Sequence, residues 1–398
     1  MLAAALLCAA YWLIAVFVLL VSAIATLVQP WLTGRRARRR DRPAVSLVLP
    51  VKLLEDGFET AQESALAQDY PQFEAIAASV DPHSPAIEKM RDILRRHAER
   101  PARVLQSTAK FAKSPKVDNL YAPFTEAVND TIFMKDSNVV LERDALAEHM
   151  RQLVDDVGLV CAIPYAARAE NLGALTEAAI MNGPHTRMLF LASAFGQGYG
   201  VGKIMLFRRR DFLRAGGFPA ISHTVGEDNA MAKAIKRIGL RTVFSHRPVR
   251  QELGVRAFKD VYQRQLRWSV IRRGDEFLSF VLEPVCQALP AFAAAAGAAA
   301  LVGLSPGVAA ALTFLLWFTV ETLLSLAKGW QIPWAAPAIL MLREAVMLSV
   351  WLNAWMTNRV TWAKDSFDAR GDMATSRVSA PPNAPAVAQD KPPANKEG

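Results

Sequence analysis

Two adjacent carboxylates, Glu227 and Asp228, stand near the start of the segment GEDNAMAKAI, whose composition is typical of a helix. Acidic residues in the first turn of a helix meet the positive end of the helix dipole, so the pair has a purely structural explanation. The same position suits a general base, because the backbone fixes the carboxylate and the dipole keeps it ionised. The pair alone leaves both interpretations open.

Further polar residues suited to a nucleotide follow two expected strands. Asp81 follows a strand that ends at Val80, and Asp136 follows the strand TIFMK. Lys116 and Asn119 open the helix expected between them. If the two strands are neighbours, both carboxylates face one crevice. One carboxylate would suit a base or ribose and the other a metal ion. The Lys116 ammonium and the Asn119 amide would suit phosphate or sugar. An Asp at a strand end is common in turns, so neither is specific by itself.

Alternating strands and helices must position these residues. Residues 44–275 form one soluble domain, and its apolar runs VSLVLPVK, FEAIAASVDP, ARVLQ, TIFMKDSN and GLVCAIPY are expected strands. Residues 85–97 are an expected helix. This alternation predicts an α/β fold with a parallel, doubly wound sheet covered by helices on both faces. Ligands of such sheets bind at the carboxyl ends of the strands.

An uncharged apolar segment precedes this domain. Residues 1–34 contain no charged residue, and the run from Leu2 to Val28 is long enough to cross a hydrocarbon core of roughly 30 Å. It lacks the basic start and short apolar core of a cleaved signal peptide, so it is predicted to remain as a transmembrane anchor. The arginine-rich stretch GRRARRRDR follows it and predicts that the next domain faces the cytosol. At this juxtamembrane position the arginines favour anionic phospholipid over nucleic acid.

Residues 276–358 are predicted to supply two or three further membrane segments. No charge occurs between Glu283 and Glu321, and the sequence SPG at 305–307 divides this run into two segments near a spanning length. Residues 359–398 end in PPNAPAVAQDKPPANKEG and are predicted to be a polar, largely disordered tail.

The third membrane segment, from Trp334 to Trp355, carries two charges in its middle, Arg343 and Glu344. Charges at that depth are costly unless they face protein, and Glu321 is the expected partner of Arg343. Whether this segment spans the membrane, or is instead re-entrant or interfacial, stays open.

Composition agrees with a membrane protein. The chain of 398 residues is 52% hydrophobic, and its formal net charge of +9 favours anionic partners such as phospholipid and nucleotide. Cys8, Cys161 and Cys286 are scattered without metal-ligand spacing, which argues against a zinc site and fits a reducing compartment. The sequence carries no signal for an oligomeric state.

Six motifs in order resemble those of inverting GT-A glycosyltransferases of the family 2/21 group, and within it the ceramide glucosyltransferases and their bacterial lipid-glycosylating relatives. They are VSLVLPVK, SVDP, PKVDN, KDSN, GEDNAMAKAI and RQLRW. The resemblance covers most of residues 40–275 and extends to the layout of the membrane segments. It implies a Rossmann-like, mostly parallel GT-A domain over residues 35–275, facing the cytosol from a bacterial inner membrane.

The resemblance implies roles for the residues that match the family's donor motifs. Asp81 matches the Asp that contacts the uracil of a UDP-sugar, and Lys116 and Asn119 match the PK-x-x-N element beside the nucleotide. Asp136 matches the metal-binding Asp of a DxD-like motif and would hold Mg²⁺ or Mn²⁺. The motif here reads Asp-Ser-Asn, and Asn138 offers a metal only a neutral carbonyl.

The remaining matches concern catalysis and phosphate. Asp228 matches the general base of the family's ED pair, with Glu227 as second candidate. Arg264, Arg267 and Trp268 match the (Q/R)-x-x-R-W signature, in which the arginines suit phosphate and the indole suits a ring.

Three weaker signals complete the candidate site. His185 resembles a histidine near the acceptor pocket of ceramide-using enzymes, although a lone histidine is more often structural. The glycines of FGQGYGVG, at 196–202, suit a flexible loop over the donor. The pattern of residues 256–273 fits either an interfacial amphipathic helix or a packed helix with a solvated basic face.

These roles predict transfer of a hexose, glucose first, from a UDP-sugar to a lipid hydroxyl with inversion, and ceramide is the first acceptor. A hopanoid or diacylglycerol acceptor fits the same motifs. A processive polysaccharide synthase shares them too, but it normally needs more membrane helices than this chain offers. A catalytically inactive membrane scaffold has no need for this combination of buried charge. No nucleic-acid partner is expected.

Overall fold

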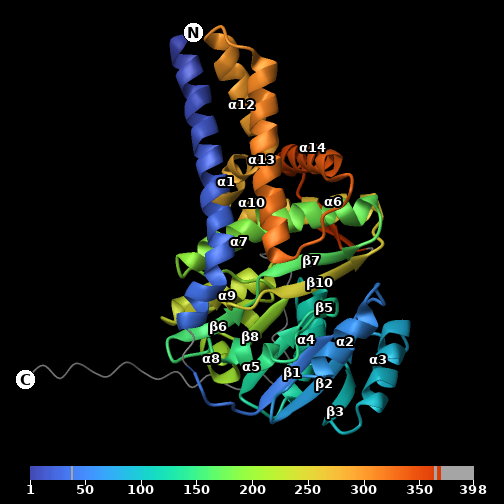
Figure 1. Ribbon diagram of the computed structural model, residues 1–398. Helices are drawn as coiled ribbons and strands as arrows, with labels where there is room; N and C mark the ends of the chain where they lie inside the picture. Colours follow the sequence, from blue (N-terminus) through green and yellow to red (C-terminus); the bar gives the residue numbers. More distant parts are fainter. Residues whose placement is uncertain (37–38, 363–364, 369–398) are drawn as a thin grey trace, which may run out of the picture.

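Seven strands form the central sheet, in the order β3-β2-β1-β4-β8-β6-β9. The structure is a computed structural model that describes residues 1–36, 39–362 and 365–368 (Figure 1). The strands are β1 (Val45–Pro50), β2 (Phe73–Ser79), β3 (Ala102–Gln106), β4 (Thr131–Lys135), β6 (Val157–Cys161), β8 (Ile204–Arg208) and β9 (Arg241–Phe244). All run parallel except β8, which is antiparallel to β4 and β6. The predicted mostly parallel α/β fold is confirmed.

The sheet is buried on both faces, which explains why its strands read as continuous apolar runs. In β1 successive side chains point to opposite faces, so Leu47 and Leu49 enter one apolar core and Val48 enters the other. Helices α2 (Phe58–Leu66), α3 (Pro85–Arg96) and α5 (Ala145–Met150) supply the first core. Helices α4 (Pro115–Glu126), α8 (Arg209–Arg214) and α9 (Glu227–Arg237), with the short η2 (Phe218–Ala220), supply the second.

The strand order corrects one expectation. All five predicted strands are present, but β1 lies between β2 and β4, so Asp81 and Asp136 do not follow neighbouring strands. The chain winds outward from β1 to β2 and β3 and then returns to the other side of β1 as β4. The reversal of winding therefore lies at the carboxyl ends of β1 and β4, where ligands of such sheets bind.

A helical layer lies between the sheet and most of the apolar helices, and the C-terminal part of α1 (Leu2–Arg36) continues past it to the α/β domain (Figure 1). The layer contains α6 (Leu172–Ile180), η1 (Met181–His185), α7 (Thr186–Ala194), α10 (Phe258–Asp275), α11 (Phe277–Val281) and η3 (Glu283–Cys286). A small sheet of β5 (Val139–Val140), β10 (Val249–Gly254) and β7 (Pro164–Ala169) lies beneath it. Helix α10 packs against α6 and α14, so the packed-helix alternative for residues 256–273 describes it better than an interfacial helix.

Three apolar helices rise from this layer side by side in Figure 1: α1 (Leu2–Arg36), α12 (Ala288–Leu301) and α13 (Pro306–Lys328). Helices α1, α13 and α14 (Ala336–Met356) are long and apolar enough to cross a membrane. Helix α12 has only 14 residues, or about 21 Å, and is shorter than the spanning length expected from its sequence. It begins only at Ala288, because η3 takes up residues 283–286, and it ends at Leu301, before the sequence SPG.

Helix α14 differs from the other two candidate spans. It lies across the foot of the bundle, against α6 and α10, and does not run alongside α1 and α13 (Figure 1). This position favours the interfacial alternative for the segment from Trp334 to Trp355.

Four buried charges at this level form what we call the membrane-foot cluster: Arg187, Glu321, Arg343 and Glu344. Arg343 lies 2.7 Å from Glu321 and 2.6 Å from Glu344, which confirms the predicted pairing of Arg343 with Glu321. Arg187 lies 3.2 Å from Glu321 and also donates to the Ser22 hydroxyl. The cluster therefore ties α7 to α1, α13 and α14.

The C-terminal tail is ordered at its start. Strands β11 (Arg359–Trp362) and β12 (Asp365–Asp368) pair antiparallel, so this part of the segment 359–398 does not follow the predicted disorder. The rest of that prediction concerns residues 369–398, which lie outside the described residues.

Candidate active site

Three carboxylates and two lysines meet at the carboxyl edge of the sheet, and we call them the carboxylate cluster: Asp136, Glu227, Asp228, Lys116 and Lys203. The Lys116 ammonium lies 2.8 Å from Asp136 Oδ1 and 3.3 Å from Glu227 Oε1. The Lys203 ammonium lies 3.2 Å from Asp136 Oδ2. The structure thus brings together four residues that the sequence singled out, with Lys203 as an addition.

Two helix starts place these side chains. Lys116 is the second residue of α4, after Pro115, whose fixed φ suits a first helical position. Glu227 and Asp228 are the first two residues of α9. The Ser114 hydroxyl donates to Glu227 Oε2 at 3.3 Å and so links the two helix starts. The positive ends of both helix dipoles therefore act on the cluster.

The glycine-rich segment 196–202 shapes the cluster. Gly202 N–H donates to Asp228 Oδ2 at 2.8 Å, and its carbonyl accepts from Lys116 at 3.2 Å. A Cβ at Gly200 would overlap the backbone carbonyl of Asp228, so only glycine permits this approach. The segment predicted as a flexible loop therefore packs directly against the candidate base and delivers Lys203 to Asp136.

The surroundings separate the carboxylates by proton affinity. Burial raises the pKa of the Glu227 and Asp228 carboxyls, and Lys116 offsets this only in part. Burial acts in the same direction on Asp136, but Lys116 and Lys203 outweigh it and hold the pKa of Asp136 below its usual range. The cluster therefore holds one firmly ionised carboxylate beside two that bind a proton more readily, a division that acid–base chemistry requires.

Helix α10 connects this cluster to the helical layer above it. Burial lowers the pKa of Arg267 to about 10, and the nearby charge of Arg264 acts in the same direction. Arg264 itself forms an ion pair with the fully buried Glu177 of α6. The Trp268 ring centroid lies 6.1 Å from that of His185. Arg264 is thus held by a carboxylate of α6, whereas the charge of Glu227 in the carboxylate cluster acts on Arg267.

Two predicted nucleotide residues lie apart from the cluster. Asp81 is exposed, and its Oδ1 accepts the His83 N–H at 3.0 Å, which is a turn-stabilising contact. Asn119 is buried and donates to the Val51 carbonyl at the end of β1, at 3.2 Å. These contacts do not connect Asp81 or Asn119 to the carboxylate cluster, so their nucleotide roles stay predictions.

Sequence reasoning missed several polar residues here. Lys203 had a usable signal, since it directly follows the glycines beside Asp228. Glu55 had none: it accepts from Asn138 Nδ2 at 2.9 Å and pairs with Arg256, contacts that join distant segments. Burial would raise the pKa of Glu55, but Arg256 outweighs it and lowers that pKa.

Further polar atoms are buried around α10 without a hydrogen-bond partner among the described residues. They are Glu177 Oε2, His185 Nε2, both amide atoms of Gln265 and Ser269 Oγ. Gln265 and Ser269 lie one helical turn apart, next to Arg264 and Trp268. Burying unpaired polar groups costs free energy unless water or a ligand satisfies them, so this layer between α6, η1 and α10 suits a polar ligand.

The donor atoms at the predicted metal site are already engaged by lysines. Both oxygens of Asp136 already lie beside ammonium groups, and Asn138 Oδ1 accepts from Lys203 at 3.2 Å. Within residues 1–36, 39–362 and 365–368, no group of three acidic, His or Cys residues is placed to hold a metal ion. The residues around Asp136 therefore do not fit a preformed divalent-cation site.

The chain is similar to known glycosyltransferases. The sequence model described as Glycosyl transferase family 21 matches residues 12–374. Ceramide glucosyltransferase 1 of Caenorhabditis elegans is 21% identical over 332 residues, which span 82% of this chain and 71% of the relative. Ceramide glucosyltransferase 3 of the same organism is 19% identical over 332 residues, spanning 82% and 72%. A solved mannosyltransferase of Pyrobaculum calidifontis, in complex with GDP-Man and Mn2+, is 19% identical with a TM-score of 0.45 over 85% of this chain and 99% of that one.

Proposed function

The chain belongs to glycosyl transferase family 21, and from this premise we propose that it transfers glucose from a UDP-sugar to the hydroxyl of a membrane lipid, with ceramide as the preferred acceptor. Its relatives named ceramide glucosyltransferase support the donor sugar and the acceptor class. The apolar helices α1, α13 and α14 fit an enzyme whose acceptor lies in a membrane. The observation that carries the proposal is the carboxylate cluster at the reversal of winding in the sheet.

Asp228 is proposed as the general base. It is half-buried, whereas Glu227 is buried and engaged by Lys116 and Ser114. Asp228 takes the proton of the acceptor hydroxyl as that oxygen attacks the anomeric carbon of the sugar. The bond from the anomeric carbon to the diphosphate breaks, and UDP leaves with the electron pair. A single displacement of this kind inverts the anomeric carbon.

The leaving diphosphate needs positive charge, and Lys116 and Lys203 supply it in this proposal. Both ammonium groups lie beside Asp136, at the positive ends of α4 and α9. Electrostatic groups already in place at a site of developing charge are a major source of catalysis. Because the residues around Asp136 do not fit a preformed metal site, no step is assigned to Mg²⁺ or Mn²⁺. The metal role that the family resemblance implies for Asp136 is not part of this proposal, and a chelator distinguishes the two.

The proposed nucleotide site extends from the cluster along the sheet edge and α10. Asp81 is assigned to the uracil and Asn119 to the nucleotide beside it, as the family resemblance implies. Arg267 is assigned to the diphosphate. The charge of Glu227 acts on its guanidinium, which indicates that Arg267 lies near the carboxylate cluster, where the diphosphate is proposed to bind. Arg264 pairs with Glu177 of α6, so in this proposal it supports the site without contacting the diphosphate. Trp268 is assigned to the face of a ring.

The acceptor hydroxyl is proposed to approach from the helical layer. The His185 ring lies beside that of Trp268, tilted by 55°. Burial, with Arg272 as a further cause, lowers the pKa of His185 to about 3, so its ring is neutral at physiological pH. A neutral imidazole offers one donor and one acceptor to a hydroxyl or amide. The unpaired groups of Gln265 and Ser269 add to this polar layer.

The membrane orientation follows the same proposal. Arg35 and Arg36 end α1 at the α/β domain, on the side that basic residues keep in the cytosol. The catalytic domain would therefore face the cytosol of a bacterial cell, with arginines against anionic phospholipid. Protease access to residues 35–42 tests this orientation. Cleavage in sealed inside-out vesicles but not in intact spheroplasts is expected, and the opposite pattern would exclude it.

A labelled-sugar assay on membranes containing the full chain tests the function. UDP-glucose, UDP-galactose, UDP-N-acetylglucosamine and UDP-glucuronic acid are each offered with ceramide, diacylglycerol or a hopanoid alcohol. The proposal expects label from UDP-glucose in ceramide, with a β-linked product, and none with Asp228→Asn. Label in a different lipid would replace the acceptor, and no label in any lipid would overturn the proposal.

A further inference from the structure

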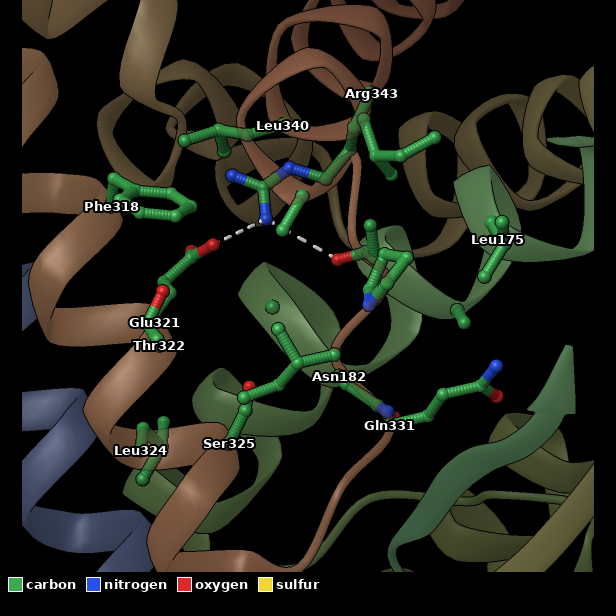
Figure 2. Close-up of a pocket in the computed structure, with 17 residues that line it drawn as sticks. Leu175, Asn182, Phe318, Glu321, Thr322, Leu324, Ser325, Gln331, Leu340 and Arg343 are labelled. Atoms are coloured by element: carbon green, nitrogen blue, oxygen red, sulfur yellow. Dashed lines mark hydrogen bonds and ion pairs between the residues drawn. The ribbon is translucent and has the colours of Figure 1, made fainter.

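A cavity lies between α6, α13 and α14, and Figure 2 shows the side chains that line it. Leu175 and Ala178 come from α6, Phe318 and Leu324 from α13, and Leu340 from α14. The space free of protein atoms is about 690 Å³, including the part open at the mouth. The wall consists largely of apolar side chains, with Phe318, Leu324 and Leu340 among them.

The charged and amide side chains in its wall already have partners within the protein. Figure 2 shows Arg343 directed toward Glu321, 2.7 Å away. Asn182 exchanges two hydrogen bonds, of 2.7 and 2.9 Å, with the backbone of Ala166. Gln331 does the same with the backbone of Ala169, at 2.9 Å each. A ligand in this cavity therefore meets apolar side chains and no uncompensated charge.

The walls place the cavity at the level of the membrane interface. Two of them, α13 and α14, are candidate membrane spans. The connection between them carries Ile332 in the cavity wall and, two residues on, the fully exposed Trp334, and tryptophan is typical of the membrane–water boundary. The third wall, α6, carries Glu177 on another side, which holds Arg264 of α10. The cavity is thus lined by two candidate membrane spans and shares α6 with the candidate active site.

We propose that this cavity binds one hydrocarbon chain of the acceptor lipid. The inference rests on the proposed function, since it names where that lipid is held. An ionic ligand does not suit the cavity, because Arg343 and Glu321 neutralise each other. A chain suits it, because every methylene moved from water onto apolar side chains contributes favourably. The cavity then selects acceptors by chain length, whereas the active site reads their polar head.

The test compares two equal substitutions on one helix. Ala336→Trp fills the cavity from the first turn of α14. Ala345→Trp, the matched control, adds the same ring to an exposed position of α14 outside the cavity wall. Both full-length variants and the wild type are assayed in nanodiscs with acceptors that share one polar head and differ in chain length.

The proposal expects a selective loss. Displacing two methylene groups should raise the KM of Ala336→Trp for long-chain acceptors about tenfold. Its KM for short-chain acceptors and for the UDP-sugar should match the wild type. Ala345→Trp should match the wild type throughout. An unchanged dependence on chain length in Ala336→Trp would overturn the inference.

A second measurement does not depend on turnover. A lipid of the same head with a diazirine at its chain end is photolysed with each protein, and the labelled peptides are identified by mass spectrometry. Labelling of residues 172–183, 318–325 and 332–343, reduced in Ala336→Trp only, is expected. Labelling elsewhere overturns the inference. If the wild type transfers no sugar to any lipid, the proposed function fails, and this labelling still decides whether the cavity holds a chain.

Discussion

Two charge clusters in this protein, each with buried and half-buried members, use similar residues and differ in their balance. The membrane-foot cluster contains two arginines and two glutamates, and each glutamate has an arginine within 3.2 Å. The carboxylate cluster contains three carboxylates and only two lysines. One cluster is complete without a ligand, whereas the other has a surplus carboxylate at the edge of the sheet.

This difference separates a structural role from a chemical one. In the membrane-foot cluster every carboxylate has an arginine partner, so its groups stay ionised. We therefore infer that this cluster is structural and holds the catalytic domain on its helices. Incomplete pairing leaves Glu227 and Asp228 with pKa values raised by burial, so the carboxylate cluster responds to protons and ligands. Changes in the first cluster should therefore alter stability, and changes in the second should alter turnover.

The largest effect is expected from Asp228→Asn. Loss of a general base typically lowers the rate about 10²- to 10⁴-fold, and the amide oxygen can still accept the Gly202 N–H. We expect kcat to fall within this range while the thermal unfolding midpoint stays near that of the wild type. Near-normal kcat in this variant would show that proton transfer does not run through Asp228. The matched Glu227→Gln variant should retain more activity, because Glu227 is already held by Lys116 and Ser114.

The reverse pattern is expected from Arg343→Met. Removing one partner of a buried ion pair leaves an uncompensated charge and typically costs about 3–5 kcal/mol. The unfolding midpoint in detergent should fall, while kcat per folded molecule changes little. The double variant Arg343→Met, Glu344→Gln keeps the pair of Arg187 with Glu321 and should recover part of the loss. A variant as stable as the wild type would contradict the structural role of the cluster.

The sequence predicted the parts of both clusters that depend on local pattern. Apolar runs mark the strands because the sheet is buried on both faces, and the helix starts at Lys116 and Glu227 follow from the residues beside them. Arg343 needed a partner at its depth, and Glu321 was the available acid one apolar segment away. These inferences concern neighbours in sequence or charges with few alternatives.

What the sequence did not predict depends on packing between distant segments. The order of β2, β1 and β4 depends on how the helices pack on each face of the sheet. The prediction that Asp81 and Asp136 follow neighbouring strands was therefore wrong. The contact of Lys203 with Asp136 requires β8 to run antiparallel beside β4, and no local pattern specifies that pairing. The sequence also did not predict how short α12 is, because the short helix η3 takes up the residues before it.

A smaller effect is expected from Lys203→Met. Hydrogen bonds between charged groups contribute about 1.5–3 kcal/mol, so the loss of this ammonium beside the diphosphate should lower kcat/KM for the UDP-sugar about 10- to 100-fold. The KM for the lipid should not change. Lys233→Met serves as the control, because Lys233 is exposed and pairs with the half-buried Glu276, which is not a member of the cluster. Equal kinetics in the two variants would remove Lys203 from the donor site.

The pH dependence should reflect the surplus carboxylate. Burial raises the pKa of Asp228 and Glu227, and the base must be ionised to accept a proton. The rate should therefore fall about tenfold per pH unit on the acid side, starting above the usual carboxyl range. Initial rates at saturating substrate, with the unfolding midpoint checked at each pH, measure this limb. An acid limb at or below pH 4 would contradict the raised pKa of the base.

The smallest effect is expected from removing divalent cations. Lys116 and Lys203 already occupy both oxygens of Asp136, so the positive charge beside the diphosphate comes from the protein itself. We expect a chelator to lower kcat less than about twofold, since lysine and metal would perform the same electrostatic role. Lys203→Met measured with and without Mn²⁺ sharpens the comparison, because a metal that takes the vacated place should restore part of the lost rate. A chelator that abolishes wild-type activity, restored by Mg²⁺ or Mn²⁺, would instead establish the metal role predicted for Asp136. The carboxylate cluster would then be completed by a cation from solution.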